Sequence, residues 1–427
     1  MIKKFKSIDG YFHENLNYNI LNKKEKLKQK KYSLLGMGNS ISNLPYNKNS
    51  LLIKINFKDK ISLNKKNLEV TANGNIEIYK LHNFLIKNSL YISSLPSYPS
   101  VTLGACVANN VHGINPKEGS INKWIKKLKI YNPNLGYKTL TRNQNTDLFN
   151  LTIGGLGLTG IILEVTIKVL RLKSTFIKKK TYKFNNILEG YNFLKENKNL
   201  YNQNNFFISN TKKNFCNGII TSGNFYGKKK IYKKLKKKTI NPIRLGILNS
   251  SLFRYLLKKI FIFFKICLDK NIIHINEALF PSNQKLFYFN LLNSKFIEHQ
   301  IIIPHKKVKC YLEDFKKIVI KNRPSITLCH LKIFSGKSKY LQFNENGLGM
   351  SIHILKNKKF NTFYRKLQSL DLKHNCKINL YKNSALNLNA VKKNYRKNYI
   401  NFNKKIKKLN KNIYFTNNIF NEKFYNG

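Results

Sequence analysis

The sequence predicts an α+β protein with more than one domain, and three observations lead to this prediction. Apolar runs of strand length alternate with glycine turns through the first 175 residues, and one segment among them has helical spacing. The segments after residue 175 are longer, contain fewer glycines and include several extended apolar runs. A chain of 427 residues is also long enough for two or three domains.

The first clear pattern covers residues 32–54, where an apolar run, a glycine turn, a polar loop and a second apolar run predict strand, loop and strand. Another strand begins at residues 68–70 and is followed by a turn at Asn73-Gly74. Residues 76–89 have the spacing of an amphipathic helix. These elements predict strands and a helix that pack together at the start of the chain.

The next elements are predicted from turn residues and β-branched runs. A pair of strands begins at Trp124 and closes over the Asn132-Pro133 turn, and a short helix covers residues 147–151. The 152–170 segment is rich in glycine at its start and ends in a β-branched strand. Further on, three extended apolar runs predict an antiparallel sheet in a second domain: residues 299–305, 325–334 and 349–355.

The charge balance of the chain is strongly basic. Lys and Arg number 79 against 19 Asp and Glu, which gives a formal net charge of +60. Such an excess is typical of proteins with phosphate-rich partners. Only seven of these residues are Arg, however, and the Lys runs are spread along the chain, whereas nucleic-acid recognition favours Arg on one face. We therefore interpret most of the Lys runs as solvated surface and expect no nucleic-acid partner.

The six cysteines lie far apart without any CxxC pair, so we expect no disulfide framework and no metal site. The basic N-terminus is not followed by an apolar stretch of the kind found in secretory signals, and we expect a cytoplasmic protein. The most apolar segment, 250–268, contains one Arg and three Lys, which disfavours a membrane-spanning helix. Two interpretations stay open: a helix at the inner face of the membrane, or a helix that covers an apolar domain face with snorkelling lysines.

Three glycine-bearing segments give the strongest functional signal. They are residues 36–40 (GMGNS), residues 96–113, which end in His112-Gly113, and residues 154–162 (GGLGLTGII). Backbone without side chains can approach a pyrophosphate and offer N–H donors to it. Each segment alone also fits an ordinary tight turn, and the first lacks the third glycine of a dinucleotide-binding fingerprint. The order of all three is hard to obtain by chance.

In these segments the sequence resembles the FAD-binding oxidases of the vanillyl-alcohol oxidase superfamily (FAD-binding PCMH type) and, within it, the decaprenylphosphoryl-beta-D-ribose oxidase family of cell-envelope biosynthesis. The resemblance is strongest over residues 96–170. It implies a two-part FAD-binding domain formed from both chain ends, residues 1–175 and a returning segment at 377–427. Residues 176–376 would form an inserted substrate domain, with an antiparallel sheet covered by helices.

The resemblance implies FAD as the cofactor. The loop at 34–44 would wrap the pyrophosphate, 96–113 would run beside the isoalloxazine ring, and 154–162 would contact the adenine-side half. Asn39 stands where covalent members often place a histidine, so we expect non-covalent FAD. The implied cofactor-binding residues are Gly36, Met37, Gly38, Asn39, Ser40, Thr102, Gly104, Ala105, Asn109, Asn110, Val111, His112, Gly157, Thr159 and Ile162.

The resemblance also implies a polar pocket built from the C-terminal half. Lys382 is the expected catalytic lysine, which would stabilise developing negative charge or, if desolvated, act as a base. His112 is the second catalytic candidate; alternatively, it only satisfies backbone groups in a tight turn. The implied substrate-contacting residues are Gln300, Lys332 and Asn379. Most of the other lysines are expected to be surface charge.

Four positions depart from the family pattern. Glu298 replaces a glutamine, Gly349 an asparagine, Ser351 a cysteine and Asn379 a tyrosine. These changes reshape the pocket, so the substrate need not be that of the family, and a flavoprotein without activity stays an alternative.

We therefore predict an FAD-dependent oxidoreductase that oxidises a secondary hydroxyl of a small-molecule or lipid-linked sugar, such as a polyprenyl-phospho-pentose. Hydride would pass to flavin N5, and a short-chain reductase would be a partner. One alternative is an aldonolactone oxidase of the same superfamily. Those enzymes commonly carry a His-Trp-Gly-Lys motif near the C-terminus, whereas the only Trp here is Trp124. The other alternative is a lysine-rich nucleic-acid-binding protein.

Overall fold

The structure is a computed structural model of the whole chain. It describes residues 1–22, 27–28, 30–113, 119–212, 215–237, 245–283, 291–292, 295–412, 414–421 and 424.

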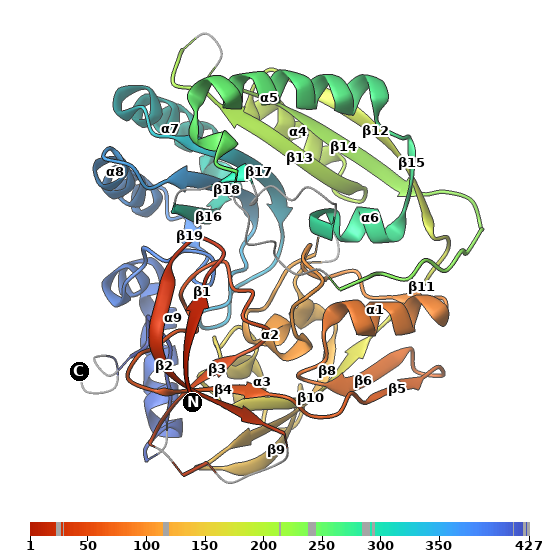
Figure 1. The fold of residues 1–427 in the computed structure, drawn as a ribbon, viewed down its shortest axis with the longest axis vertical. Coiled ribbons are helices and arrows are strands. Elements are labelled where there is room, and N and C mark those ends of the chain that lie inside the picture. The colour runs from red at the N-terminus through yellow and green to blue at the C-terminus, as the bar shows by residue number, and fades with distance from the viewer. Residues whose placement is uncertain are drawn as a thin grey trace.

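Both ends of the chain meet in one sheet, formed in this order by β1 (Ile2–Lys6), β2 (Phe12–Leu21), β4 (Leu51–Ile55), β3 (Lys31–Leu35) and β20 (Tyr414–Phe415). The sheet is parallel from β2 to β20, and β1 pairs antiparallel with β2. Figure 1 shows the red N-terminal strands beside the blue C-terminal segment. The two strands predicted within 32–54 are confirmed as β3 and β4, whereas the sequence pattern did not predict β1 and β2.

A second, antiparallel sheet is formed in this order by β5 (Ile61–Asn64), β6 (Glu69–Asn73), β10 (Ile161–Lys168), β8 (Ile125–Asn132) and β9 (Gly136–Thr141). The hairpin predicted over Asn132-Pro133 is confirmed by the pairing of β8 with β9. The predicted helices are confirmed as α1 (Ile78–Lys87) and α3 (Thr146–Thr152). A short pair, β7 (Leu90–Tyr91) with β11 (Leu170–Arg171), connects this region to the long sheet.

The longest sheet is antiparallel and is formed in this order by β15 (Ile272–His274), β12 (Phe176–Phe184), β14 (Cys216–Phe225), β13 (Tyr201–Ile208), β17 (Ile326–Phe334), β18 (Gly347–Leu355), β16 (Phe296–Pro304) and β19 (Lys377–Ile378). The three extended apolar runs of the sequence are confirmed as β16, β17 and β18. The fold therefore mixes helices with sheets as predicted. The division of the chain at residues 175 and 376 stays a prediction.

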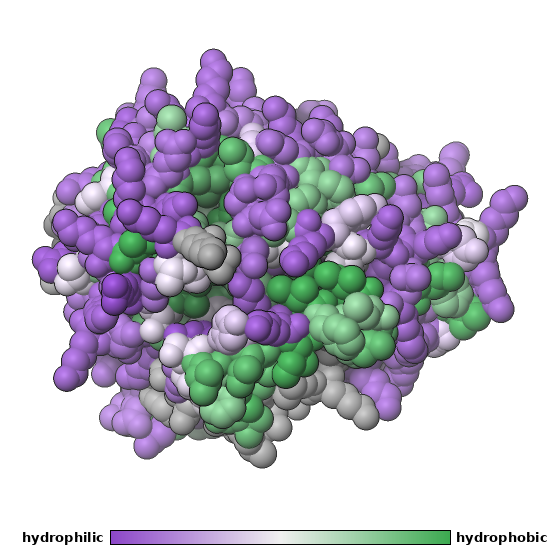
Figure 2. Space-filling model, turned by 90° about the horizontal axis from the view of Figure 1, so that it is seen from above, coloured by the Kyte–Doolittle hydropathy of each residue, from purple (hydrophilic) through white to green (hydrophobic). Residues whose placement is uncertain are grey.

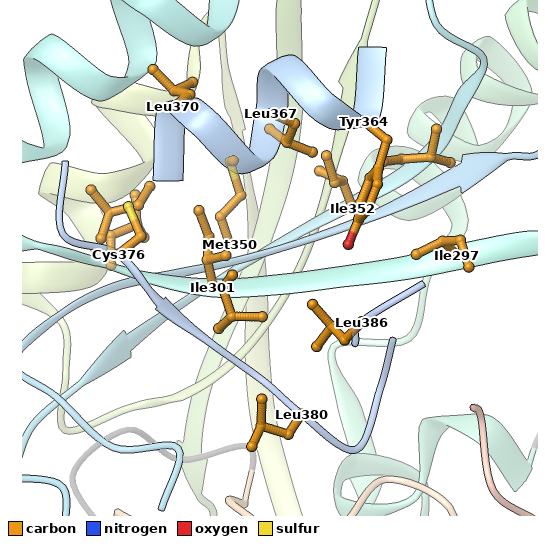
Figure 3. Packing of buried hydrophobic residues seen from close by; sticks show 14 of the residues in the cluster. Ile297, Ile301, Met350, Ile352, Tyr364, Leu367, Leu370, Cys376, Leu380 and Leu386 are labelled. Atoms are coloured by element: carbon orange, nitrogen blue, oxygen red, sulfur yellow. The ribbon is translucent and has the colours of Figure 1, made fainter. Parts of the chain in front are cut away.

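Helices α4 (Ile187–Glu196), α7 (Val308–Asn322) and α8 (Phe360–Lys373) pack on one face of the long sheet. Figure 3 shows Tyr364 of α8 pointing down beside Ile352, towards the strands that also carry Ile297, Ile301 and Met350. Every described residue of β18 is buried, because helices cover one of its faces and the rest of the protein covers the other. This apolar layer fixes the strands that carry polar residues on their opposite face.

Strand β13 shows how the two faces of the long sheet differ. Phe206 is fully buried and packs against Gly190 of α4, where an added Cβ would lie 2.3 Å from its ring. The next residue, Phe207, points to the other face and contacts Phe261, with ring centroids 6.2 Å apart. Phe261 belongs to α5 (Ser251–Phe263), which Figure 1 shows across the sheet from α4. The two faces are thus covered by different helices.

Helix α5 contains most of the 250–268 segment, for which the sequence left two interpretations open. A helix that covers an apolar domain face would bury its apolar side chains and hold its lysines outward. In α5 no residue is buried, and Phe253, Ile260 and Phe263 are among the exposed large apolar residues. Leu257, Phe261 and Ile262 are half-buried, so α5 covers the sheet with part of its apolar surface and exposes the rest. The choice between the two interpretations therefore stays a prediction. In the described part of the chain, no helix combines the length and the apolar character that crossing a membrane requires.

The remaining helices close the ends of the molecule. α9 (Leu388–Leu409) buries Val391, Tyr395, Tyr399, Phe402 and Ile406 in the core beneath the long sheet. α6 (Ile275–Leu279) follows β15, and its Asn276 bonds the buried His82 of α1 at 2.8 Å. α2 (Leu103–Ala108), which the sequence pattern did not predict, lies within the second glycine-bearing segment. These contacts join the two antiparallel sheets into one body.

Gly74 is the point at which α2 and β10 approach most closely. Its N–H donates to the Leu163 carbonyl at 2.8 Å, and its carbonyl accepts from the Gly104 N–H at 2.7 Å. A Cβ on Gly74 would lie 2.0 Å from the Ile162 carbonyl oxygen, and one on Gly104 would lie 2.9 Å from the Gly74 carbonyl oxygen. Both positions therefore require glycine.

We expect Gly74→Ala to lower the free energy of unfolding by about 1–3 kcal/mol, because the new methyl group must displace backbone rather than a flexible side chain. Urea denaturation followed by circular dichroism measures this change. Lys66→Ala, in the exposed turn between β5 and β6, is the control and should leave stability unchanged. A Gly74→Ala protein as stable as the control would contradict the close approach.

Candidate functional site

A cavity of about 1510 Å³ lies where the three glycine-bearing segments face the long sheet and α5. It is lined by backbone of all three segments and by side chains of β16, β17 and β18. Most residues singled out in the sequence lie in its wall: Gly36, Met37, Gly38, Asn39, Ser40, Thr102, Gly104, Ala105, Asn109, Val111, His112, Gly157, Ile162, Gln300, Lys332 and Lys382. Segments that are distant in the sequence therefore converge on one space.

Three of the singled-out residues lie behind the wall rather than in it. Asn110 is fully buried, and its Oδ1 accepts from the Asn122 N–H at 3.3 Å. Thr159 is buried, and its carbonyl accepts from Asn132. Asn379 is buried beneath Gln300. These three side chains are placed to support the wall of the cavity.

The first glycine turn presents open backbone to the cavity. Gly38 has a φ of +76°, which favours glycine, and a Cβ there would meet no protein atom within 4 Å. In the part of the chain that the structure describes, the N–H groups of Gly38, Asn39 and Ser40 have no acceptor. The Asn39 side chain is held by the Ser100 carbonyl at 2.6 Å. Successive open N–H groups at such a turn suit anionic oxygens.

Small side chains bring the second glycine-bearing segment against the first. The Thr102 side chain caps α2 by accepting from the Ala105 N–H. A Cβ on Gly36 would lie 3.0 Å from Thr102 Oγ1 and 3.4 Å from the Ala105 Cβ. A larger residue at Gly36 would therefore push the two segments apart and narrow the cavity between them.

Asn75 lies in the cavity wall and carries a buried acceptor that the described residues leave unused. Its Nδ2 donates to the Phe57 carbonyl at 2.8 Å, whereas its buried Oδ1 has no partner among the described residues. Buried acceptors are normally satisfied, so this one suits a hydroxyl or amino group of a ligand. Together with the open N–H groups of the 38–40 turn and the size of the cavity, Asn75 makes the residues present fit FAD.

His112 lies between two polar side chains of the long sheet. Lys332 Nζ is 2.8 Å from His112 Nδ1, and Gln300 Nε2 is 3.4 Å from His112 Nε2. Phe334 meets the imidazole edge to face, with ring centroids 4.8 Å apart. Burial and the positive charges of Lys332 and Lys382 hold the pKa of His112 well below its ordinary value. The imidazole is therefore neutral at pH 7.

Asn379 sets the orientation of Gln300. Asn379 Nδ2 donates to Gln300 Oε1 at 2.6 Å, and the Asn379 N–H donates to the Gln300 carbonyl at 2.9 Å. Because its oxygen is engaged by Asn379, Gln300 turns its amide nitrogen to His112. Asn379 thus acts on the cavity through Gln300.

Glu298 is the counter-charge of Lys382. Lys382 Nζ lies 2.8 Å from Glu298 Oε1, which also accepts from Ser351 Oγ at 2.8 Å, and His353 Nε2 lies 3.6 Å from Oε2. Burial alone would raise the pKa of Glu298, but Lys382 and His353 hold it below its ordinary value. Glu298 is therefore an ionised carboxylate that holds the Lys382 ammonium in the wall of the cavity.

The two lysines of the site have different electrostatic surroundings. Burial and the neighbouring charge of Lys382 lower the pKa of Lys332 from 10.5 to about 7. Lys382 has a carboxylate partner in Glu298. Acid–base sites typically contain titratable groups of the same kind that lie in different electrostatic environments. The cavity therefore holds an amine that can exchange a proton near pH 7, beside a lysine that is ion-paired with a carboxylate.

The sequence analysis placed Glu298 in the pocket only as a departure from the family pattern and did not predict its pairing with Lys382. It did not assign His353 or Asn75 to the site. Glu298 carried a signal, because it is an acidic residue within an otherwise apolar strand of a chain with only 19 acidic residues. His353 and Asn75 carried none, since each is placed by contacts between distant segments. In the described residues, no group of three or more His, Cys, Asp or Glu side chains is placed to hold a metal ion.

Part of the glycine-bearing region matches a known protein family. Residues 25–136 match the family described as FAD binding domain. This range contains the first two glycine-bearing segments, the open turn at 36–40, Asn75 and His112. Residues 25–136, which form one part of the cavity wall, thus match an FAD binding domain, as the sequence predicted.

Several curated proteins are similar to this chain. D-arabinono-1,4-lactone oxidase of Candida glabrata is 27% identical over 180 residues, which are 40% of this chain and 34% of that protein. Decaprenylphosphoryl-beta-D-ribose oxidase of Mycolicibacterium smegmatis is 27% identical over 144 residues, 33% of this chain and 31% of that protein. L-gulonolactone oxidase of Mus musculus is 24% identical over 139 residues, 33% of this chain and 32% of that protein. The match thus spans about a third of each relative's length.

We expect Lys332→Met to remove a pH-dependent part of the stability. Between pH 7 and 10.5 the unfolded chain binds a proton at Lys332 that the folded protein does not, so the wild type gains stability as pH rises through this window. The variant lacks this gain. Its stability relative to the wild type should therefore be highest near pH 7 and fall towards pH 10, as measured by urea denaturation at a series of pH values.

Lys337→Met, at an exposed position just after β17, is the matched control and should follow the wild type at every pH. A constant stability difference between the Lys332→Met protein and the wild type over this window would contradict the lowered pKa of Lys332.

Proposed function

We propose, from the FAD binding domain that this chain carries, that the protein is an FAD-dependent oxidoreductase that oxidises a hydroxyl group of a sugar-type substrate. The observation that supports this proposal most directly is the wall of the cavity opposite the glycine turns. There a neutral histidine, a lysine with a pKa of about 7 and an ion-paired lysine lie together. The oxidation of an alcohol needs a group that accepts the hydroxyl proton and a positive charge that stabilises the negative charge developing on the oxygen.

The cofactor and the protein have separate tasks in this proposal. FAD, when bound, supplies the acceptor for the hydride of the carbinol carbon. The chain contributes open N–H groups at residues 38–40 for the anionic part of the cofactor and Asn75 Oδ1 as an acceptor. Asn39, in place of a histidine, supports non-covalent binding.

Lys382 is proposed to act as a fixed positive charge. Its ammonium is held by Glu298 in the cavity wall, where it can donate a hydrogen bond to the substrate oxygen and stabilise negative charge on it. Glu298 acts through Lys382 and is a positioning residue. The change from glutamine to glutamate at this position therefore fits a site that keeps its lysine charged.

The hydroxyl proton is proposed to pass to the pair formed by His112 and Lys332. Both groups are neutral at or just above pH 7, and the 2.8 Å contact between His112 Nδ1 and Lys332 Nζ lets a proton move between them. Gln300 fixes the other edge of the imidazole. Of the two roles expected for Lys382 from the sequence, the proposal keeps the stabilisation of negative charge and gives the role of base to His112 and Lys332, because Lys382 has a carboxylate partner.

The substrate is proposed to be a sugar or a lipid-linked sugar, with a secondary hydroxyl as the reacting group. Some similar proteins are named for decaprenylphosphoryl-ribose and others for sugar 1,4-lactones. A cavity with several cations favours a substrate that carries phosphate, such as a polyprenyl-phospho-pentose. A 1,4-lactone is the second candidate, and a short-chain reductase is proposed as the partner in the former case.

The purified protein should show flavin absorbance bands between about 300 and 550 nm. Acid precipitation should release the flavin into the supernatant, because the cofactor is held without a covalent bond. The absorbance spectrum before and after precipitation measures both points. A colourless protein that FAD cannot reconstitute would contradict the proposal. It would favour the basic nucleic-acid-binding alternative, which predicts salt-sensitive binding to DNA or RNA.

Lys382→Met should slow flavin bleaching by a reactive sugar by about 10²–10³-fold, because the charge that stabilises the substrate oxygen is removed. Anaerobic bleaching is measured with polyprenyl-phospho-pentoses and with 1,4-lactones, and the faster class identifies the substrate. Lys358→Met, on the exposed surface, should react as the wild type does. Unchanged bleaching by the Lys382→Met protein at equal FAD content would refute the role of Lys382.

A further inference from the structure

Helix α5 and the π-helical turn after it (η4, Phe264–Leu268) turn apolar side chains outward. Six of these side chains are 43–62% exposed and recur along the helix on its outer side: Leu252, Phe253, Leu256, Ile260, Phe263 and Leu268. Figure 2 looks onto this end of the molecule from above and shows green apolar patches bordered by purple hydrophilic residues. A contiguous exposed apolar surface of this kind marks an interaction site.

Three of the four cations of this segment, Arg254, Lys258 and Lys265, are half-buried and have partners within the protein, whereas Lys259 is exposed. Arg254 Nη1 donates to the Leu248 and Asn249 carbonyls, both at 2.8 Å. Lys258 lies 5.6 Å from the centroid of the Phe207 ring on β13, and burial lowers its pKa. Lys265 pairs with Asp269 at 2.9 Å. This orientation is the reverse of a helix on a water-exposed surface, which holds its charges outward.

We propose that the outer face of α5 and η4 rests on an anionic lipid bilayer. The apolar side chains would enter the boundary between headgroups and acyl chains, as they do in other interfacial helices. The exposed Lys259 and Lys270 lie beside them at the level of the headgroups. The net charge of +60 attracts the whole protein to an anionic surface.

Charge also decides against the other occupants of this surface. A second copy of the chain would bring two molecules of +60 together, and their mutual repulsion opposes an interface. A nucleic acid matches the net charge, but it gives the apolar face of α5 no apolar partner. An anionic bilayer satisfies both the apolar face and the charge.

The helix connects this surface to the cavity. Tyr255, Ile260 and Phe264 are exposed and also line the cavity, so α5 forms part of its rim. A substrate held in the bilayer by a lipid tail would meet this rim first. The connection to a lipid-linked sugar rests on the proposed function, whereas the docking surface does not.

The test is sedimentation of the full-length protein with vesicles of phosphatidylcholine that contain about 30% phosphatidylserine. The wild type should sediment with these vesicles, and much less with phosphatidylcholine alone or at high salt. The double variant Leu256→Ser/Phe263→Ser changes two outward side chains that do not line the cavity. It should bind at least about tenfold more weakly, because the apolar part of the attraction is reduced.

The matched control is Leu135→Ser/Tyr137→Ser, which changes two exposed apolar side chains in the β8–β9 hairpin, at the opposite end of the molecule in Figure 1. This variant should bind as the wild type does. Absence of wild-type binding, equal binding to uncharged vesicles, or equal binding of the α5 variant would overturn the proposal. Analytical ultracentrifugation tests the alternative partner. If the wild type and the control self-associate and the α5 variant does not, the bilayer proposal is overturned and the surface is an interface between two copies of the chain. Flavin content and bleaching are read separately, so failure of the catalytic proposal leaves this result interpretable.

Discussion

The cavity depends on one steric constraint, the close approach of backbone at Gly74 and Gly104. The hydrogen bond between these residues brings α2 against the end of β6, and the bond from Gly74 to Leu163 joins both to β10. A side chain at either position would separate elements that carry the second and third glycine-bearing segments. The first segment then packs on α2 through Gly36. A single set of contacts without side chains thus holds together the half of the cavity that belongs to the FAD binding domain.

The other half of the cavity depends on electrostatics rather than on sterics. β17 of the long sheet carries Lys332, and the segment after β19 carries Lys382. Both line the cavity, and two neighbouring cations in a partly enclosed space destabilise each other. The buried carboxylate of Glu298 offsets this repulsion for Lys382 by forming an ion pair with it. Among the described residues no carboxylate pairs with Lys332, whose polar contact is the imidazole of His112. The difference between the two lysines follows from the position of one acidic side chain.

The fold was predictable where local pattern and tertiary structure agree. The strands of β8, β9 and β16–β18 and the helices α1 and α3 follow from apolar spacing and turn residues. β1 and β2 were not predictable, because β1 is rich in lysine and β2 in asparagine, and they form strands through pairing with each other and with β4. Within the site, glycine spacing predicted the cofactor loops. The pairing of Lys382 with Glu298 requires contact between the long sheet and the returning segment, which one sequence alone does not specify.

Helix α5 illustrates how a composition can mislead until the orientation of each side chain is known. Its one arginine and three lysines made a membrane-spanning helix unacceptable, and that conclusion holds. The same residues also supported a helix that snorkels its lysines away from the protein. In the structure three of these cations instead have partners within the protein. Arg254 donates to a backbone carbonyl, Lys258 lies over the Phe207 ring, and Lys265 pairs with the Asp269 carboxylate. Because these three cations have partners within the protein, the apolar side chains are left outside, and the exposed Lys259 is the one cation of α5 that would have to lie among the headgroups.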